Sequence, residues 1–212
     1  MRPGRWLLER TESSGSRGSV AIPISDLPEL LDAVRADERL HVADLVDLIV
    51  FIAGTGVRIS EACALAWEDV DREAGTVSVR KSKTDAGVRR ITVSTTLVEL
   101  LVARRAQGAP NDSAQVFPTV LGRKRDPRAV ARDWADARGR LGVPDRYTFH
   151  AFRKTMATLL DQAGLTARDI AEYLGHTNPA LTQTVYMSKT VGGTRAADAV
   201  DSLLGPPFTD RK

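Results

Sequence analysis

Residues 40–61 read LHVADLVDLIVFIAGTGVRISE, and the fold is most readily inferred from this segment. The apolar run from Leu40 to Ala53 predicts a buried helix, which Gly54-Thr55-Gly56 brings to an end. A further helix is expected to begin near Val57 and to continue to Trp67. Because the first of these two helices is so apolar, other elements must pack around it to bury its side chains.

Those other elements are indicated by the patterns on either side. Ser25 or Asp26 can cap a helix that places Leu27, Leu30, Leu31 and Val34 on one stripe. Alternating residues at 76–80 and 89–93 predict two short strands, joined by a turn that contains Asp85-Ala86-Gly87. Helical patterns return at 95–106, 126–140, 148–163, 166–174, 179–186 and 194–204. We therefore expect a predominantly helical α+β fold with a small antiparallel sheet.

Composition limits the class of protein. The chain has 212 residues, of which 42% are hydrophobic and 27% charged, as in one soluble globular domain. Residues 1–22 are rich in Arg, Ser and Gly and predict a flexible tail or a linker remnant, followed by a domain at 23–212. A net charge of +3 permits a polyanionic partner without requiring one.

Several functions are excluded by what the sequence lacks. No apolar run approaches the ~20 residues that cross a bilayer, and no secretory signal precedes the domain. The single Cys63 cannot form an internal disulfide, so the cytoplasm is the expected location. Neither a metal-ligand pattern nor a glycine-rich nucleotide loop is present, and we expect no metal and no cofactor.

Two pairs of side chains stand at spacings that suit phosphate chemistry. Arg58 and Glu61 lie three residues apart at the start of a helix and therefore share a face. His150 and Arg153 share a later helix, where arginine can grip a phosphate with two N–H groups while histidine moves a proton. A solvated surface ion pair and a surface histidine would explain the same spacings.

Two further residues follow in the last third of the chain. Gly175 suits a left-handed helix end, and the turn that it allows presents His176. Tyr186 comes ten residues later, among apolar and small neighbours, where a core tyrosine is the alternative.

The order and intervals of these residues resemble the tyrosine recombinases, the family of phage integrases and Xer-type resolvases. The resemblance covers residues 25–190. It lies in three separated segments, which are TGVRISE at 55–61 with LAWEDVD at 65–71, TFHAFRKT at 148–155, and LGHT at 174–177 followed by Thr182 and Tyr186.

The resemblance implies a role for each of these residues in one catalytic site. Arg58 and Arg153 would clamp the scissile phosphate and Tyr186 would attack it, while His150 and His176 would hydrogen-bond the phosphate or handle the proton of the nucleophile. Lys83 matches the hairpin lysine that protonates the departing 5′ oxygen, and Lys81 competes for that role. Glu61 matches an acidic residue that orients the phosphate-binding groups.

The implied function is site-specific DNA recombination through a 3′-phosphotyrosyl intermediate, as in phage integration. The expected partners are double-stranded DNA, a homotetramer on paired sites built by exchange of the C-terminal helix, and an accessory DNA-bending protein, all in the bacterial cytoplasm or nucleoid. DNA contacts are expected from basic residues on the hairpin and near 126, namely Arg80, Lys81, Arg89, Arg90, Arg123, Lys124, Arg125, Arg128 and Arg132.

Two other functions remain open at this point. A type IB topoisomerase uses similar residues to nick and reseal one strand, and a DNA-binding regulator could keep the fold without catalysis. Family members also carry a helical domain ahead of the catalytic one, for which this chain has no room, so we expect it to be either a fragment or variant product or a naturally short recombinase. We therefore expect weak, salt-sensitive binding to DNA by this form of the protein.

Overall fold

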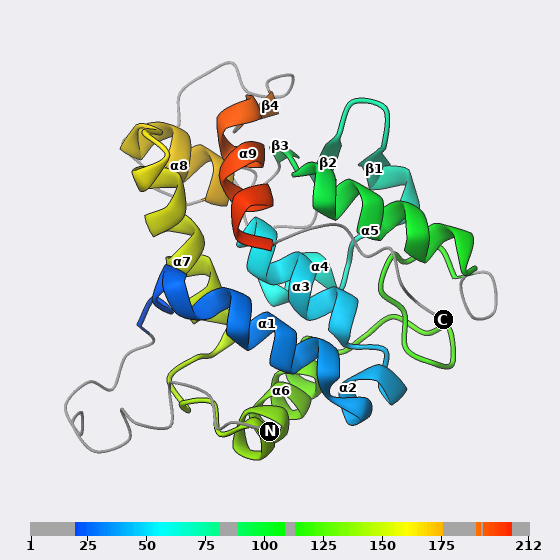
Figure 1. The fold of residues 1–212 in the computed structure, drawn as a ribbon. Coiled ribbons are helices and arrows are strands. Elements are labelled where there is room, and N and C mark those ends of the chain that lie inside the picture. Colours follow the sequence, from blue (N-terminus) through cyan, green and yellow to red (C-terminus); the bar gives the residue numbers. More distant parts are fainter. Residues whose placement is uncertain (1–19, 81–88, 109–112, 176–189, 192, 205–212) are drawn as a thin grey trace.

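The computed structural model describes residues 20–80, 89–108, 113–175, 190–191 and 193–204. The domain is mostly helical, and a small sheet lies on one side of it, beside α5 and α9 (Figure 1). In chain order the elements are the 3₁₀ turn η2 (Ile24–Asp26), α1 (Leu27–Ala36), α2 (Glu38–Val42), α3 (Val46–Thr55), α4 (Ile59–Ala62), the 3₁₀ turn η3 (Trp67–Asp69), β1 (Val70–Asp71), β2 (Thr76–Val79), β3 (Arg89–Thr92), α5 (Thr95–Ala106), α6 (Pro127–Leu141), α7 (Phe149–Gln162), α8 (Ala167–Leu174), β4 (Thr190–Val191) and α9 (Gly193–Leu204).

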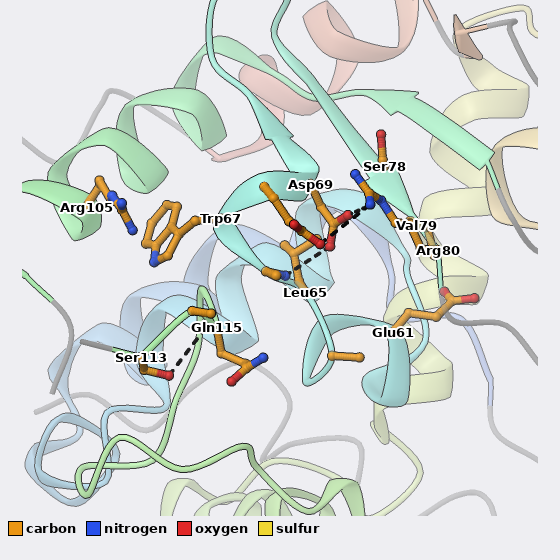
Figure 2. Close-up of a pocket in the computed structure, with 14 residues that line it drawn as sticks. Glu61, Leu65, Trp67, Asp69, Ser78, Val79, Arg80, Arg105, Ser113 and Gln115 are labelled. Atoms are coloured by element: carbon orange, nitrogen blue, oxygen red, sulfur yellow. Dashed lines mark hydrogen bonds and ion pairs between the residues drawn. The ribbon is translucent and has the colours of Figure 1, made fainter. Parts of the chain in front are cut away.

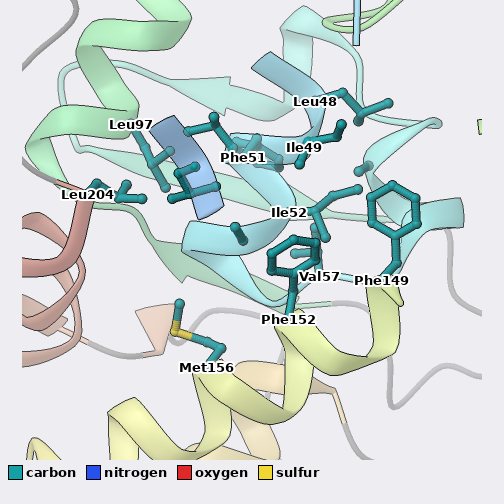
Figure 3. Close-up of a cluster of buried hydrophobic side chains, with 14 of the residues drawn as sticks. Leu48, Ile49, Phe51, Ile52, Val57, Leu97, Phe149, Phe152, Met156 and Leu204 are labelled. Atoms are coloured by element: carbon teal, nitrogen blue, oxygen red, sulfur yellow. The ribbon is translucent and has the colours of Figure 1, made fainter. Parts of the chain in front are cut away.

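Helix α3 is the centre of the fold. Every residue from Val46 to Thr55 is buried, and α1, α5, α7 and α9 pack around it. Figure 3 shows side chains of these neighbours, among them Leu97, Phe152 and Leu204, in one apolar cluster with those of α3. A helix that is apolar on all sides is stable only when it is enclosed in this way.

The end of α3 depends on a glycine. Gly56 has a φ of 65°, and a Cβ placed there would lie 2.8 Å from the Cβ of Met156 in α7. A side chain would therefore be strained by the backbone conformation and would collide with α7. The close approach of α7 brings Arg153 next to the turn that carries Arg58.

The predicted helix from Leu40 to Ala53 is wrong as a continuous element. It divides into α2 and α3 at Asp44, which has a φ of 53°, and the Leu45 N–H donates to the Leu40 carbonyl instead of continuing a helix. Asp44 gains an ion pair by this break, because its carboxylate accepts hydrogen bonds from Arg104 at 2.8 and 2.5 Å.

The predicted helix from Val57 to Trp67 is also too long. Only Ile59–Ala62 is helical, and the chain then pairs with a distant segment. The Val116 N–H donates to the Leu65 carbonyl at 2.9 Å, and the Trp67 N–H donates to the Ala114 carbonyl at 2.9 Å. Backbone pairing to residues 114–116 replaces the last turns of the expected helix.

The sheet has the strand order β1-β2-β3-β4. β2 and β3 form the predicted antiparallel hairpin, and β1, which was not predicted, pairs antiparallel with β2, so that Val77 lies opposite Val70 and Ile91. β4 adds a parallel strand beside β3, which the sequence did not indicate. Arg89 and Ile91 face the protein interior on β3, whereas Arg90 between them is exposed.

Packing begins before the predicted domain boundary at residue 23. Ile22 is buried, and its N–H donates to the Thr155 hydroxyl of α7 at 2.7 Å. The remaining predicted tail, through residue 19, and the predicted helix at 179–186 lie outside the described residues. No helix in the described part of the chain is long and apolar enough to cross a membrane.

Candidate active site

Arg58 and Glu61 form the first part of the site. Arg58 is the residue before α4, and Glu61 lies in its first turn, so the Glu61 carboxylate can accept from the Arg58 backbone N–H at 2.8 Å. The same carboxylate accepts from Nη1 of Arg58 at 2.9 Å. Glu61 is 2% exposed and Arg58 39%, so the guanidinium is held from behind while one side of it meets solvent.

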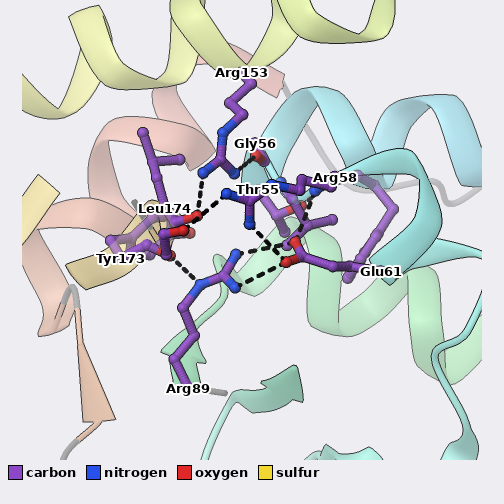
Figure 4. A network of polar contacts seen from close by, with 11 residues as sticks. Thr55, Gly56, Arg58, Glu61, Arg89, Arg153, Tyr173 and Leu174 are labelled. Atoms are coloured by element: carbon purple, nitrogen blue, oxygen red, sulfur yellow. Dashed lines mark hydrogen bonds and ion pairs between the residues drawn. The ribbon is translucent and has the colours of Figure 1, made fainter. Parts of the chain in front are cut away.

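Arg153 approaches from the opposite side, on α7. Its Nη1 donates to the Gly56 carbonyl at 2.8 Å, and its Nη2 donates to the Leu174 carbonyl. Nη2 of Arg58 likewise donates to a backbone carbonyl, that of Gly175, at 2.8 Å. The two guanidiniums predicted to clamp a phosphate therefore meet at consecutive carbonyls (Figure 4).

A third arginine completes this cluster. Arg89 of β3 donates from Nη1 and Nη2 to the two carboxylate oxygens of Glu61, each at 3.2 Å, and from Nε to the Tyr173 carbonyl at 2.5 Å. Tyr173, Leu174 and Gly175 thus each offer a carbonyl to a different arginine. The last carbonyls of a helix lack intrahelical partners and carry partial negative charge, so cations stabilise them.

The end of α8 is thereby fixed against three other elements. Gly175 is left-handed at φ 67°, as predicted, and His176 follows it directly in the sequence. His176 itself lies outside the described residues.

The charges of the cluster shift the pKa values of its members. Burial alone would raise the pKa of Glu61, but Arg89 and then Arg58 outweigh it and hold that pKa below its usual value. Burial lowers the pKa of Arg153 to about 10, and the charges of Arg58 and Arg89 act in the same direction. The cluster holds three arginines and one carboxylate, of which only Arg58 and Arg89 bond to Glu61, and its excess positive charge favours binding of an anion.

His150 stands at the edge of this cluster. It is exposed in the first turn of α7, one turn before Arg153. Partial burial lowers the pKa of its imidazole, and the charges of Lys154, Arg153 and Arg58 lower it further. A neutral imidazole can accept a proton, which suits a group that assists a nucleophile.

The remaining predicted catalytic residues, Lys83, His176 and Tyr186, lie outside the described residues, as does Lys81. The other two tyrosines of the chain are described, and both are 1% exposed. Burial raises the pKa of Tyr173, and its hydroxyl donates to the Thr92 carbonyl at 3.4 Å. Neither Tyr147 nor Tyr173 is accessible to a DNA strand.

Two of the predicted DNA contacts are wrong. Arg89 is 8% exposed and its nitrogens donate to Glu61 and Tyr173, so it faces the interior. Arg125 is 7% exposed and donates from Nη2 to the Ala43 and Asp44 carbonyls, both at 2.9 Å. Each guanidinium satisfies polar groups of the protein instead of facing solvent.

The other predicted contacts in the described part of the chain are exposed. Arg80 is ion-paired with Asp69 at 2.5 Å and Glu68 at 3.5 Å, and it would have to exchange these partners for a phosphate. The side chains open to solvent are Arg90 on β3 and Arg123, Lys124, Arg128 and Arg132 around the start of α6.

A pocket of about 490 Å³ lies beside the cluster (Figure 2). Glu61 contributes to its lining, together with Trp67, Arg80 and Arg105, and the Arg105 guanidinium stacks 4.9 Å from the centre of the Trp67 ring. Arg58, His150 and Arg153 do not line it. The candidate site is therefore the surface above the arginines and not this pocket.

The charge of Arg89 does not indicate its burial, but the alternation of β3 does. Arg89, Ile91 and Val93 share one face of the strand, and the last two are apolar. An arginine on that face must be buried and paired.

Helix α9 packs on its own domain. Ala196, Val200, Leu203 and Leu204 are buried. Asp201 accepts from the N–H groups of Thr95 at 2.9 Å and Thr96 at 2.8 Å, and it thereby caps α5. Exchange of this helix between protomers would require these contacts to break first.

Known proteins are similar to this chain in both sequence and fold. Residues 22–191 match the model of the phage integrase family. Tyrosine recombinase XerC of Xanthomonas axonopodis pv. citri is 33% identical over 190 residues, which cover 84% of this chain and 61% of that protein. A XerC-like tyrosine recombinase of Caldanaerobacter subterraneus subsp. tengcongensis is 26% identical over 183 residues, covering 70% of this chain and 46% of that protein.

Solved structures of a recombinase and an integrase have folds similar to that of this chain. The crystal structure of XerA recombinase has a TM-score of 0.63 at 25% identity, over 79% of this chain and 60% of that one. The lambda integrase catalytic core has a TM-score of 0.59 at 19% identity, over 76% of this chain and 96% of that one, and this likeness shows the fold. The chain spans about three-fifths of the length of the Xanthomonas XerC and about half of the length of the Caldanaerobacter XerC-like recombinase. On the family match, the identity with XerC and the shared fold, the chain belongs to the phage integrase family.

Proposed function

We propose that this chain carries the catalytic site of a site-specific DNA recombinase, which cleaves a DNA strand and rejoins it through a 3′-phosphotyrosyl intermediate. The observation that carries the proposal is the meeting of Arg58 and Arg153 at the carbonyls of Leu174 and Gly175, directly before His176. The relatives described above, which bear the name tyrosine recombinase, support the same assignment.

The arginines account for the electrostatic part of the reaction. A phosphodiester resists attack because it is negatively charged, and that charge grows as a fifth oxygen approaches phosphorus. Arg58 and Arg153 neutralise the growing charge, and Glu61 holds Arg58 in place at no cost in reorganisation.

The bond changes balance without an external energy source. The Tyr186 hydroxyl oxygen attacks phosphorus and forms the phosphotyrosyl ester, while the bond to the 5′ oxygen breaks. Lys83, or Lys81 in its place, gives a proton to that oxygen, and His150 or His176 takes the hydroxyl proton or hydrogen-bonds the phosphate. In the reverse step a 5′ hydroxyl of another strand attacks the ester and releases the tyrosine.

The partners follow from this reaction. Arg90, Arg123, Lys124, Arg128 and Arg132 are the exposed cations that we assign to phosphates of the duplex. Four protomers on two sites would exchange α9 after its contacts with its own domain, including those of Asp201 to Thr95 and Thr96, have broken, and an accessory protein would bend the DNA. Such an enzyme acts in the bacterial cytoplasm or nucleoid.

Two solved relatives make this assembly reasonable. One is the Tn1549 transposon integrase in complex with transposon right end DNA, and the other is a lambda integrase tetramer bound to a Holliday junction. At 23% and 18% identity, both share the fold with this chain.

Covalent trapping tests the proposal. The chain is incubated with a pool of nicked duplexes of randomised sequence, in which the short cleaved fragment diffuses away, and adducts are separated on a denaturing gel. We expect an adduct with the wild type and with Tyr173→Phe, and none with Tyr186→Phe. An adduct that survives Tyr186→Phe, or a wild type that forms none at any salt concentration, would overturn the assignment.

The same material separates recombination from the topoisomerase alternative. Two duplexes that carry the site recovered from the adducts are mixed and incubated with the wild-type protein. Recombination predicts joint molecules between two duplexes, whereas relaxation of supercoiled DNA without joint molecules would indicate a nicking and closing enzyme.

A further inference from the structure

Arg89 occupies an unusual position for a cation in a protein expected to bind DNA. Its side chain is 5% exposed, and the carboxylate that it faces, on Glu61, is 2% exposed. Glu61 already accepts two hydrogen bonds from Arg58. A single buried carboxylate therefore serves two arginines, of which Arg58 reaches solvent and Arg89 does not.

The directions of the Arg89 donors suggest what it does there. Nη1 and Nη2 point to Glu61 in the first turn of α4, and Nε points to the Tyr173 carbonyl at the end of α8 (Figure 4). One planar group thus joins three elements that are far apart in the sequence, which are α4, α8 and its own strand β3. A lysine could not do this, since it lacks a rigid fork of donors.

Gly175 adds an independent observation. A Cβ at Gly175 would lie 2.7 Å from Nη1 of Arg89 and 3.0 Å from its Cζ. The turn that leads to His176 therefore packs directly on the Arg89 guanidinium, and the carbonyl of the same glycine accepts from Arg58. Moving Arg89 would remove two of the four hydrogen bonds to the Glu61 carboxylate and the packing against this turn.

We propose that Arg89 is a positioning residue of the active site, which fixes Glu61 and the end of α8 relative to each other and so orients Arg58 and the turn before His176. The inference rests on the proposed function, because it assigns Arg89 to the same reaction. It replaces the expectation that Arg89 binds a DNA phosphate.

A matched pair of substitutions separates positioning from general stability. Arg104, like Arg89, is 8% exposed. Its Nε donates to the Val116 carbonyl, and its Nη atoms donate to the carboxylates of Asp44 and Asp47. It belongs to a network outside the site. Arg89→Lys and Arg104→Lys therefore remove the same kind of interaction at two places.

The first measurement is single-turnover formation of the covalent adduct, with a nicked duplex recovered from the randomised pool and protein in excess. Arg89→Lys should lower the rate constant at saturation about 10²-fold, as expected for misplaced catalytic groups, and change the Kd for the duplex less than about threefold. Arg104→Lys should keep the wild-type rate to within about threefold at a temperature where both variants are folded. Equal rates for Arg89→Lys and the wild type, or equal losses for both variants, would overturn the inference.

The second measurement does not depend on activity. The Nε–H signal of Arg58, assigned by its loss in Arg58→Lys, is recorded by ¹⁵N NMR in both lysine variants. We expect it to shift or broaden in Arg89→Lys and to stay unchanged in Arg104→Lys. A wild type without any adduct would refute the proposed function, whereas an unchanged Arg58 signal in Arg89→Lys would refute the positioning role.

Discussion

Replacing Glu61 with glutamine tests the centre of the arginine cluster. Four hydrogen bonds reach the two carboxylate oxygens, at 2.8 and 2.9 Å from Arg58 and at 3.2 Å twice from Arg89. A glutamine keeps one oxygen and turns the other into an NH₂ group. Two of the four donors would then face another donor, and the negative charge between the guanidiniums would be lost.

The size of the effect follows from these contacts. Removing one partner of a buried ion pair costs about 3–5 kcal/mol. Two lost hydrogen bonds to a charged group, at about 1.5–3 kcal/mol each, give a similar figure. For a domain of this length each kcal/mol corresponds to roughly 2–4 °C, so the Tm of Glu61→Gln should fall by about 6–20 °C.

Thermal unfolding followed by circular dichroism at neutral pH measures this difference. Glu68→Gln is the matched control, because Glu68 is 73% exposed and lies 3.5 Å from Arg80, where an ion pair contributes at most about 1 kcal/mol. A Tm of Glu61→Gln within about 3 °C of the wild type would refute the view that Glu61 holds the cluster together.

The pH dependence of stability gives a second result for the same variant. The pKa of Glu61 is lower in the folded protein than in the unfolded chain, so its contribution is present above the unfolded value and is lost as pH falls through the folded value. Between about pH 6 and pH 3 the wild type should therefore lose more stability than Glu61→Gln. Parallel curves would contradict the assigned shift.

Three further substitutions probe other parts of the structure. Gly175→Ala should lower the free energy of unfolding, measured in urea, by more than the ~1–2 kcal/mol that a left-handed alanine costs. The control Gly164→Ala, at φ 80° and with no atom within 4 Å of the added Cβ, should cost only that amount, and equal losses in the two variants would contradict close packing at Gly175. Asp201→Asn should cost about 1 kcal/mol and speed hydrogen exchange in α9, and unchanged exchange would mean that this cap does not hold the helix. Lys124→Ala should reduce the slope of log K against log salt for DNA binding by about 1, and an unchanged slope would remove Lys124 from the interface.

Much of the fold could be predicted from local patterns. The apolar run around Leu48 predicts the central helix, the alternation at 76–80 and 89–93 predicts the hairpin strands observed at 76–79 and 89–92, and Gly175 predicts the left-handed helix end. These features depend on residues close to one another in sequence, which is why they are readable without a structure.

The errors arose where distant partners decide the local conformation. Asp44 breaks the predicted helix at 40–53 because Arg104, sixty residues away, pairs with it. The segment after Ala62 leaves the helix because residues 114–116 pair with its backbone. No local pattern encodes such partners.

The candidate site shows the same division. Arg58, Glu61 and Arg153 were identified by their spacing and by resemblance to a family, and the structure brings these three together. The expectation that Arg89 and Arg125 contact DNA rests on their charge together with the family resemblance, and neither distinguishes a phosphate contact from a buried, hydrogen-bonded guanidinium.

We propose that the cationic cluster presents one phosphodiester to Tyr186, and mass spectrometry of the trapped adduct, after digestion with a protease and a nuclease, identifies the residue that attacks it. We expect the modified peptide to contain Tyr186 and to carry a nucleotide joined through its 3′ phosphate. A 5′ linkage, or a nucleotide on any other side chain, would contradict it.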